Sequence, residues 1–284
     1  MPDLTDSRLA RPEGQCHPFQ VITGAAELLE AADASARLST QALFGEIVDG
    51  FGRQGDYVHG RLRRDHYVGW IHVTNLSQQV TCPTHKVSAL RTFAYAEPDL
   101  KAPVACALSR GATLALTATE GQYVKCAAGW VHSRHVARLD TQEADPVSVA
   151  ETYLHTPYRW GGRDSVGLDC TGLIQQAFEA AGVLLPRDSD MQYAWAGEHI
   201  ADWKVSGALK RGDLLFWKGH AGIMTDAHHL LHANAWHMAV AHEPLDQAIT
   251  RIKTYYAEPV GARRIDLDSL AGQVPHWMGE AVAY

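Results

Sequence analysis

The alternation of apolar and polar positions divides the chain into a strand-rich first half and a mixed second half. From about Phe19 to Asp140, short apolar runs alternate with glycine, aspartate and proline breaks, a pattern typical of strands joined by turns. The runs that predict strands are EIVDGF (46–51), DYVHGRL (56–62), YVGWIHV (67–73), ATLALTAT (112–119), QYVKCA (122–127) and GWVHSRHV (129–136). Residues 1–18 are mostly polar and predict an N-terminal arm.

Two stretches of this half resemble each other. Residues 57–76 and 123–139 both run from a Tyr-Val strand into Gly-Trp, an aliphatic residue and His. The repetition predicts two copies of one small all-β barrel, each of about sixty residues. We expect the boundary near 81–84, which gives barrels over 19–80 and 81–140. Chance similarity between two ordinary strands is the alternative.

Helical spacing of apolar residues begins near Thr141. Residues 145–156 predict a helix with Asp145 as its N-cap, and residues 169–183 predict a second helix that Gly182 would end. One apolar face of the second helix contains Leu173, Ile174, Ala177, Phe178 and Ala181.

Strand-like runs follow this helix, and they set the fold class. Residues 213–219, 220–225, 229–234 and 260–265 predict strands, and residues 244–256 predict a helix. A helix followed by an antiparallel sheet is an α+β pattern. We expect this α+β domain over 141–266, with 267–284 as a C-terminal extension.

Composition narrows the classes of protein to consider. With 46% hydrophobic and 20% charged residues, the chain resembles an ordinary soluble globular protein. The formal net charge of −7 argues against a nucleic-acid partner, and no apolar run approaches the ~18 residues of a transmembrane helix. The first residues lack the basic start and apolar run of a secretory signal, so a cytoplasmic location is expected. Five cysteines with no CxxC pair favour reduced thiols over disulfides.

Cys170 follows Asp169 at the start of the second predicted helix. A cysteine there is a candidate structural thiol, metal ligand or nucleophile. If Asp169 caps the helix, the thiol lies in the first turn, where the helix dipole favours a thiolate. A nucleophilic thiol also needs a base, usually histidine, to accept and return its proton.

His220 and His232 form the candidate base pair. They lie twelve residues apart around a midpoint at Asp226. If 220–224 and 228–232 are the arms of a hairpin, the two histidines are directly opposed, with Cβ atoms ~4.5–5.5 Å apart. One ring then acts as the base and the second orients it. Ordinary surface or core histidines remain the alternative at this point.

A zinc hydrolase built from the histidines of HHLLH (228–232) is a second alternative. The segment lacks the HExxH motif. His228, His229 and His232 also alternate across a strand, which suits three ligands on one face poorly. We therefore expect no metal site.

Four blocks of the second half resemble the signature blocks of the NlpC/p60 peptidases, which are papain-like cysteine enzymes that cleave bacterial cell-wall peptides. The blocks are PYRWGGRDSVGLDCTGLIQQAF (157–178), LPRDSDMQ (185–192), RGDLLFWKGHAGIM (211–224) and LLHANAWHMAV (230–240), and GARRI (261–265) resembles the final strand of the family. The resemblance implies a papain-like domain, in which the helix carrying the cysteine packs on an antiparallel sheet. The two preceding barrels resemble bacterial SH3-like domains.

The resemblance also implies roles for individual residues. Cys170 is the expected nucleophile, His220 the general base and acid, and His232 the residue that orients His220. The residues that resemble the family's substrate pocket are Tyr158, Trp160, Asp169, Thr171 and Asp188, with Glu46 and Tyr67 of the first barrel. The backbone N–H of Cys170 is the expected oxyanion donor. No cofactor is implied.

Bacterial SH3-like domains accompany this catalytic domain in the gamma-D-glutamyl-L-diamino acid endopeptidases of murein peptide recycling. The resemblance implies hydrolysis of the bond between D-γ-glutamate and the diamino acid in free L-Ala-γ-D-Glu-diamino acid peptides, through a cysteine thioester. A site that buries the free alanine ammonium must supply carboxylate and aromatic partners.

Two further alternatives stay open. The chain could be a wall-peptide-binding protein with an inactive papain-like domain, or an amidase or acyltransferase acting on another amide. Murein peptides are the expected partners and no membrane is expected, whereas oligomeric state is left open by the sequence.

Overall fold

The computed structural model describes residues 6–279, and these divide into two compact units. The β unit comprises residues 6–141 together with 161–165, and the α+β unit comprises residues 142–160 and 166–279. The short loop 161–165, which the sequence placed in the α+β domain, is thus grouped with the strand-rich half.

The first β domain of the β unit is a single antiparallel sheet of seven strands in the order β3-β2-β6-β5-β4-β1-β7. Its strands are β1 (His17–Val21), β2 (Ala25–Leu29), β3 (Leu38–Leu43), β4 (Ile47–Gln54), β5 (Tyr57–Leu62), β6 (Val68–His72) and β7 (Leu76–Ser77). Strands β4, β5 and β6 coincide with predicted runs, whereas β2 and β3 fall in stretches for which no strand was predicted.

The second β domain contains two sheets, ordered β10-β9-β14-β13-β12 and β11-β8-β15. Its strands are β8 (His85–Val87), β9 (Arg91–Tyr95), β10 (Val104–Ser109), β11 (Thr113–Leu114), β12 (Ala118–Glu120), β13 (Tyr123–Cys126), β14 (Gly129–His132) and β15 (Val136–Arg138). The predicted strand over 112–119 is wrong as one element, because residues 115–117 separate β11 from β12.

The internal repetition of the sequence has a structural counterpart. In the first β domain His72 caps a 3₁₀ helix (Val73–Asn75), and in the second His132 caps a 3₁₀ helix (Ser133–His135). Each histidine side chain accepts a hydrogen bond from the backbone N–H two residues later, and each helix leads into a short strand. The predicted strand over 129–136 is therefore interrupted by this helical turn.

The hydrophobic core of the second β domain extends into the first. Leu43 and Phe44 of the first β domain pack with Val87, Leu108 and other buried side chains of the second. Gly45 has a φ of 82°, and a Cβ placed there would lie 2.0 Å from the carbonyl oxygen of Thr113. This close approach requires glycine at position 45.

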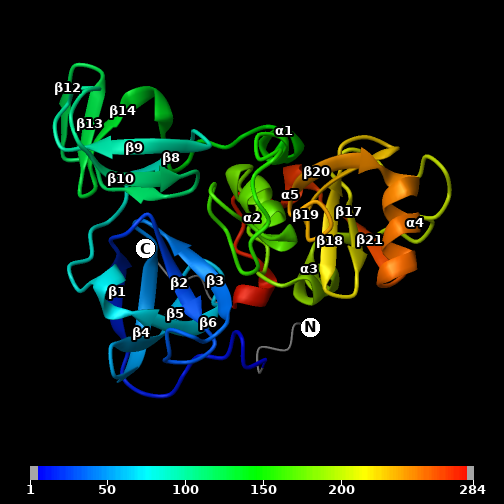
Figure 1. Cartoon of the computed structure of the whole chain (residues 1–284), viewed down its shortest axis with the longest axis horizontal. Coiled ribbons are helices and arrows are strands. Elements are labelled where there is room, and N and C mark those ends of the chain that lie inside the picture. Colours follow the sequence, from blue (N-terminus) through cyan, green and yellow to red (C-terminus); the bar gives the residue numbers. More distant parts are fainter. Residues whose placement is uncertain (1–5, 280–284) are drawn as a thin grey trace. The chain divides into compact units, whose positions relative to one another are not determined.

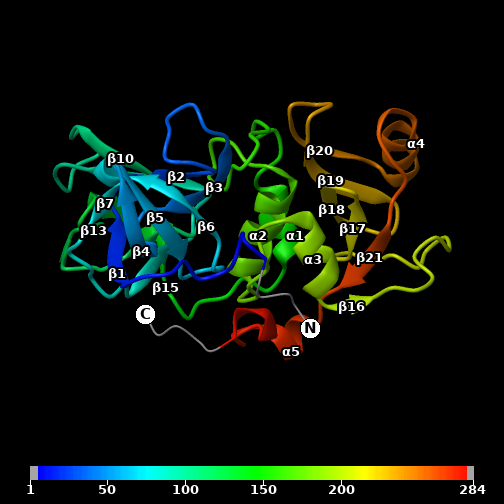
Figure 2. The same cartoon turned by 90° about the horizontal axis from the view of Figure 1, so that it is seen from below.

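The α+β unit is built on a six-stranded sheet in the order β16-β21-β17-β18-β19-β20. Its strands are β16 (Glu198–His199), β17 (Leu214–Trp217), β18 (His220–Met224), β19 (His229–Asn234), β20 (Ala239–Pro244) and β21 (Gly261–Arg264). Its helices are α1 (Pro146–Glu151), α2 (Cys170–Ala180), α3 (Ser189–Trp195), α4 (Leu245–Tyr255) and α5 (Leu267–Leu270), with a 3₁₀ helix at His276–Met278. Figures 1 and 2 show α2 and α4 on opposite sides of this sheet.

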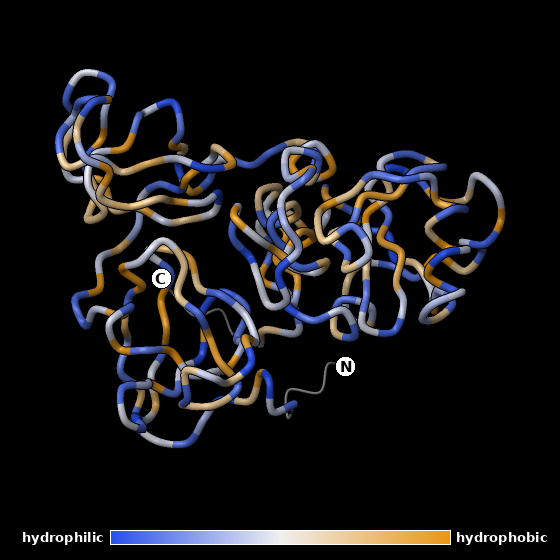
Figure 3. Tube along the Cα trace, viewed as in Figure 1, coloured by the Kyte–Doolittle hydropathy of each residue, from blue (hydrophilic) through white to orange (hydrophobic). Residues whose placement is uncertain are grey.

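Helix α2 begins and ends where the sequence predicts. The Asp169 side chain accepts a hydrogen bond from the backbone N–H of Gly172 at 2.8 Å, and Gly182 follows the helix with a φ of 84°. The apolar face, including Leu173 and Phe178, is buried. Hydrophobic residues also concentrate in the central strands of the sheet (Figure 3), so the helix and the sheet bury complementary surfaces.

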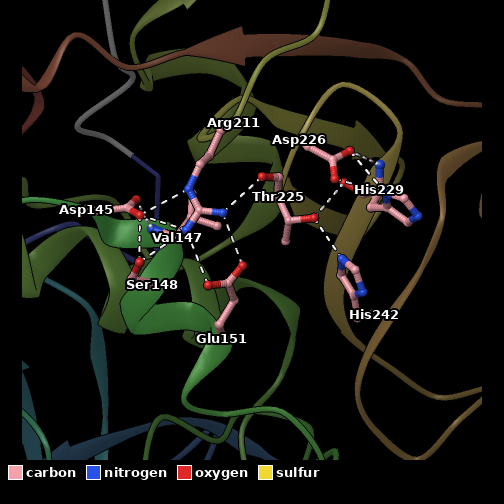
Figure 4. A network of polar contacts seen from close by, with 9 residues as sticks. All are labelled: Asp145, Val147, Ser148, Glu151, Arg211, Thr225, Asp226, His229 and His242. Atoms are coloured by element: carbon pink, nitrogen blue, oxygen red, sulfur yellow. Dashed lines mark hydrogen bonds and ion pairs between the residues drawn. The ribbon is translucent and has the colours of Figure 1, made fainter.

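Arg211 connects α1 to the sheet through ion pairs and hydrogen bonds (Figure 4). Its guanidinium donates to Asp145 and Glu151 of the α1 region and, at 2.9 Å, to the carbonyl of Thr225 just after β18. These ion pairs are about 40% exposed, so each contributes less than about 1 kcal/mol. The arginine therefore sets the position of α1 more than it adds to stability.

Within residues 6–279, no helix is long and apolar enough to span a membrane.

Candidate active site

Cys170 is the first residue of α2 and is buried, with 7% of its surface exposed. Helix α2 packs against β18 and β19. The backbone N–H groups of Ala221, the second residue of β18, and of Thr171 both reach the thiol. The thiol therefore faces the start of β18, the strand whose first residue is His220.

His220 and His232 are joined directly. The distance from His220 Nε2 to His232 Nδ1 is 2.8 Å. His232 is fully buried, and His220 is largely buried. Because Nε2 of His220 is engaged by His232, Nδ1 is the ring atom of His220 left to exchange a proton with a thiol.

The register of this hairpin differs from the predicted one. Strand β18 pairs with β19 through Ile223–Leu231 and Met224–Leu230. Extended along the strands, this register puts Gly222 opposite His232, so the expectation that the two histidines are directly opposed is wrong. A shift of two residues keeps both rings on the same face, because side chains alternate with a period of two.

Small residues beside His232 make this diagonal contact possible. A Cβ at Gly222 would lie 3.2 Å from the His232 Cβ. On the other side, His232 pairs with Ala241 of β20. The residues directly beside His232 on the two neighbouring strands, Gly222 and Ala241, are thus small. They leave space for longer side chains of both strands to contact the His232 ring diagonally.

Burial dominates the electrostatics of the thiol and of its candidate base. Burial and the charge of Asp169 raise the pKa of the Cys170 thiol to about 12. Burial, then His232 and Arg251, hold the pKa of His220 well below its ordinary value. The expected preference for a thiolate at the helix start is therefore outweighed, and the resting site favours a neutral thiol beside a neutral imidazole.

These shifts predict a low acid limit for activity. A base with a lowered pKa stays deprotonated, and competent, until the pH falls through that lowered value. We expect the acid limb of kcat/KM to have its midpoint below pH 6.5, the ordinary value for histidine. Peptide carboxylates (pKa about 4) and amines (about 8) do not titrate between pH 5 and 7. Initial rates measured between pH 5 and 7 test whether the pKa of the base is lowered. A midpoint of the acid limb above pH 7 would contradict this prediction.

Asp169 and Thr171, two predicted substrate contacts, are held from inside the protein by Arg187. The Arg187 guanidinium donates to Asp169 Oδ1 at 2.9 Å and Oδ2 at 2.6 Å, and to Thr171 Oγ1 at 2.7 Å. Arg187 and Asp169 are both buried. No role was predicted for Arg187, although it lies in the LPRDSDMQ block. The pair fixes the residues on either side of Cys170, and a substrate role for Asp169 and Thr171 stays a prediction.

Tyr158 lies close enough to Cys170 for the two groups to interact electrostatically. Burial, then the neighbouring Cys170 and Asp169, raise the pKa of the Tyr158 phenol above its ordinary value, so it keeps its proton. Its backbone N–H donates to the carbonyl of Met238 at 2.9 Å, which joins it to the turn between β19 and β20. Trp160 is 65% exposed, and Asp188 is half-buried at the N-cap of α3.

Glu46 and Tyr67 belong to the β unit, and both are buried. The Glu46 carboxylate is bound by two nitrogens of Arg163, at 3.1 and 3.2 Å, and Arg64 lies 3.8 Å away. Arg163 is part of the loop 161–165 that the structure groups with this unit. The carboxylate thus already has cationic partners in the β unit, and its predicted contact with a substrate ammonium remains a prediction, as does that of Tyr67.

The histidines of HHLLH point to different partners. His229 Nδ1 lies 3.0 Å from Asp226 Oδ2, and its ring stacks on His242 with centroids 5.1 Å apart (Figure 4). His232, in contrast, is directed toward His220. Among residues 6–279, no three His, Cys, Asp or Glu side chains are arranged to hold a metal ion.

Glu243 and Arg251 are two further residues at the site for which no role was predicted. His232 Nε2 lies 2.6 Å from Glu243 Oε1, and the Arg251 guanidinium donates to the same oxygen. No strand was predicted over β20, which carries Glu243. Strand alternation places Ala241 and Glu243 on one face, but with Val240 as its one buried residue this segment alternates too weakly to predict a strand.

Two known protein families match parts of the chain. Residues 155–257 match the NlpC/P60 family, and residues 28–76 match the bacterial dipeptidyl-peptidase SH3 domain. The matches define the class as a papain-like peptidase domain preceded by a bacterial SH3 domain. They confirm the fold class expected from the sequence.

A relative that is similar over 69% of this chain shows the family to which the chain belongs. The gamma-D-glutamyl-L-lysine dipeptidyl-peptidase of Bacillus subtilis (strain 168) is 30% identical over 224 residues, which cover 69% of this chain and 72% of that protein. The chain belongs to the NlpC/P60 family of peptidases, and the resemblance seen in its sequence blocks is confirmed.

Two other relatives complete the comparison. Dipeptidyl-peptidase 6 of Lysinibacillus sphaericus is 31% identical over 108 residues, which are 37% of this chain and 38% of that protein's length. The crystal structure of an NlpC/P60 family protein from Bacillus cereus ATCC 10987 matches with a TM-score of 0.72 over 87% of this chain and 99% of that chain. At 22% identity, this second likeness shows the shared fold.

Proposed function

We propose that the protein is a cysteine endopeptidase that hydrolyses the bond between D-γ-glutamate and the diamino acid in free murein peptides with an unblocked N-terminal L-alanine. The observation that carries the proposal is the 2.8 Å hydrogen bond between His220 and His232, at the start of the strand that the Cys170 thiol faces. Support for the bond specificity comes from the relative whose name gives a gamma-D-glutamyl-L-lysine dipeptidyl-peptidase.

The first half of the reaction forms a thioester. Cys170 Sγ attacks the γ-carbonyl carbon of D-glutamate while His220 Nδ1 accepts the thiol proton. Negative charge develops on the carbonyl oxygen, where the backbone N–H of Cys170 and the protonated Tyr158 hydroxyl are the candidate donors. The tetrahedral species collapses as His220 returns the proton to the departing amine of the diamino acid.

The second half releases the dipeptide. Water attacks the thioester carbon as His220 accepts its proton, and the C–S bond then breaks as His220 returns that proton to the departing Cys170 sulfur. The new carboxylic acid releases its remaining proton to solvent. The products are L-Ala-D-Glu with a free γ-carboxylate, the diamino acid released in the first half, and the regenerated Cys170 thiol. His232 orients the His220 ring in both halves.

The requirement for a free N-terminus gives the test of the proposal. N-acetylation of L-Ala-γ-D-Glu-diamino acid replaces the charged ammonium by a neutral and larger amide, so the site loses the charge-assisted hydrogen bonds that it makes with the ammonium. We expect kcat/KM to fall at least about tenfold, which corresponds to ~1.4 kcal/mol. Mass spectrometry of products from the lysine and diaminopimelate peptides measures both the rate and the bond cleaved.

A matched control separates charge from size. Replacing the N-terminal alanine by glycine keeps the ammonium and removes one methyl group, which costs only about 0.8 kcal/mol. Equal turnover of the acetylated and free peptides would remove the free-amine requirement. Binding of the tripeptide with no release of dipeptide would favour a wall-peptide-binding protein, and cleavage of only another amide would favour an amidase or acyltransferase.

A further inference from the structure

Glu243 extends the histidine pair by one member. In the β19–β20 register, His232 faces Ala241 and Leu230 faces Glu243, so Glu243 reaches His232 diagonally. The distance from His232 Nε2 to Glu243 Oε1 is 2.6 Å. The side chain of His232 is fully buried and that of Glu243 is 13% exposed, so water competes little for this contact.

Arg251 of α4 holds Glu243 in place. Its guanidinium donates to the oxygen of Glu243 that also faces His232, and its side chain is 18% exposed. The guanidinium carbon lies 5.3 Å from the centroid of the Trp236 ring, which stacks on Tyr255. The arginine is thus fixed by a carboxylate on one side and by an aromatic face on the other.

Glu243 is ionised in this setting. Burial by itself would raise its pKa, but the hydrogen bond and charge of His232, together with Arg251 and His237, outweigh burial and lower the pKa of Glu243. An ionised carboxylate only accepts hydrogen bonds. His232 must therefore carry its proton on Nε2.

The position of the proton on His232 determines the position of the proton on His220, the candidate base. With its proton on Nε2, His232 has a lone pair on Nδ1, which accepts the N–H of His220 Nε2. His220 then has its own lone pair on Nδ1, where the proposed mechanism needs a base. A single carboxylate thereby selects one of two tautomers in each of two rings.

We propose that Glu243, anchored by Arg251, is a positioning residue that fixes the tautomers of His232 and His220 and stabilises the positive charge that forms on His220 when it accepts the Cys170 proton. The inference rests on the proposed function, since it concerns the same thiol and base. Glu243 itself touches neither the thiol nor a reacting atom.

The test compares two variants with opposite expected shifts. Glu243→Gln keeps an oxygen that can accept from His232 but removes the negative charge, so imidazolium on His220 is less stable. We expect kcat to fall about ten- to a hundredfold with KM unchanged, and the acid limb of the rate profile to move to lower pH. Arg251→Met removes a positive charge that faces both rings, and we expect that limb to move to higher pH.

The matched control is Glu258→Gln, which removes the same charge from an exposed glutamate paired with Lys253. We expect its rate profile to match that of the wild type. Unchanged kcat and acid limb in Glu243→Gln, or shifts in the same direction in Glu243→Gln and Arg251→Met, would overturn the inference. Loss of activity through misfolding is identified by the thermal unfolding of each variant.

A second readout does not depend on turnover. In protein labelled with ¹⁵N-histidine, we expect His232 to show a protonated Nε2 and an unprotonated Nδ1 near neutral pH, and Glu243→Leu to populate both tautomers. The opposite tautomer in the wild type overturns the inference even if the enzyme is active. An inactive wild type with the expected tautomer contradicts the proposed function and leaves the positioning of His232 standing.

Discussion

Cys170→Ala is expected to lower kcat for the tripeptide by on the order of 10⁵-fold, because removing the nucleophile of a catalytic triad removes the covalent route altogether. The buried thiol is replaced by a smaller group at the first turn of α2, and the Asp169 cap and the Arg187 ion pair are left in place. Binding of the peptide is expected to persist. Product release measured by mass spectrometry, with peptide binding measured by calorimetry, separates the two effects.

Cys82→Ala is the control for this variant. Cys82 is an exposed free cysteine, so its replacement removes a thiol but leaves the candidate active site unchanged. We expect wild-type rates. A Cys170→Ala protein that retains even one part in a hundred of the wild-type rate would mean that another group attacks the peptide.

Arg187→Leu is expected to destabilise the protein by about 3–5 kcal/mol, because it leaves the buried Asp169 carboxylate without its cation. The present pair buries both charges and satisfies them with two hydrogen bonds between Arg187 and Asp169. Loss of Arg187 also removes a charge that lowers the pKa of Cys170. Urea unfolding followed by circular dichroism gives the free energy.

A second substitution isolates the cause of this loss. In Asp169→Asn/Arg187→Leu the buried charge is gone, and asparagine remains a good N-cap for α2. We expect the double variant to recover more than half of the stability that Arg187→Leu loses. A double variant no more stable than Arg187→Leu would show that packing around the guanidinium, rather than the unpaired carboxylate, sets the loss.

The pairing of His220 with His232 was predictable because strand alternation tolerates an error of two residues. The sequence places the centre of the turn at Asp226, whereas the observed pairs centre the hairpin on residue 227. In this turn, Asp226 Oδ1 accepts hydrogen bonds from the backbone N–H groups of both His228 and His229. The register shifts by two, and both rings keep the same face. A shift of one residue would have separated them.

Residues that support the site from other elements were out of reach of local patterns. Arg187 meets Asp169 across eighteen positions of sequence, and its pairing depends on how the loop after α2 returns to the start of that helix. Glu243 depends on β20, a strand with one fully buried residue, Val240, whose alternation is weak. Helix N-caps, set by neighbouring residues, were predicted correctly, since Asp145 and Asp169 both cap the helices expected of them. The end of α2 near Gly182 was also predicted, whereas α1 ends at Glu151, five residues before the predicted end of that helix.

The position of the loop 161–165 was also not predictable from the sequence. Its sequence belongs to the block that carries Cys170, and the sequence analysis placed it in the same domain. In the structure Arg163 binds Gln41 and Glu46, and Ser165 binds Ser109, all in the β unit. These contacts depend on tertiary pairing over more than fifty residues, which periodicity along the chain does not encode.

Trapping with hydroxylamine tests most directly whether Cys170 carries the acyl group of the peptide. Hydroxylamine is close to water in size, so it enters where the hydrolytic water enters and attacks the same thioester carbon. We expect the γ-hydroxamate of L-Ala-D-Glu to form at the expense of the free dipeptide, with the two together equal to the diamino acid released. Release of diamino acid with free dipeptide as the sole partner product, at every hydroxylamine concentration, would contradict a thioester on Cys170.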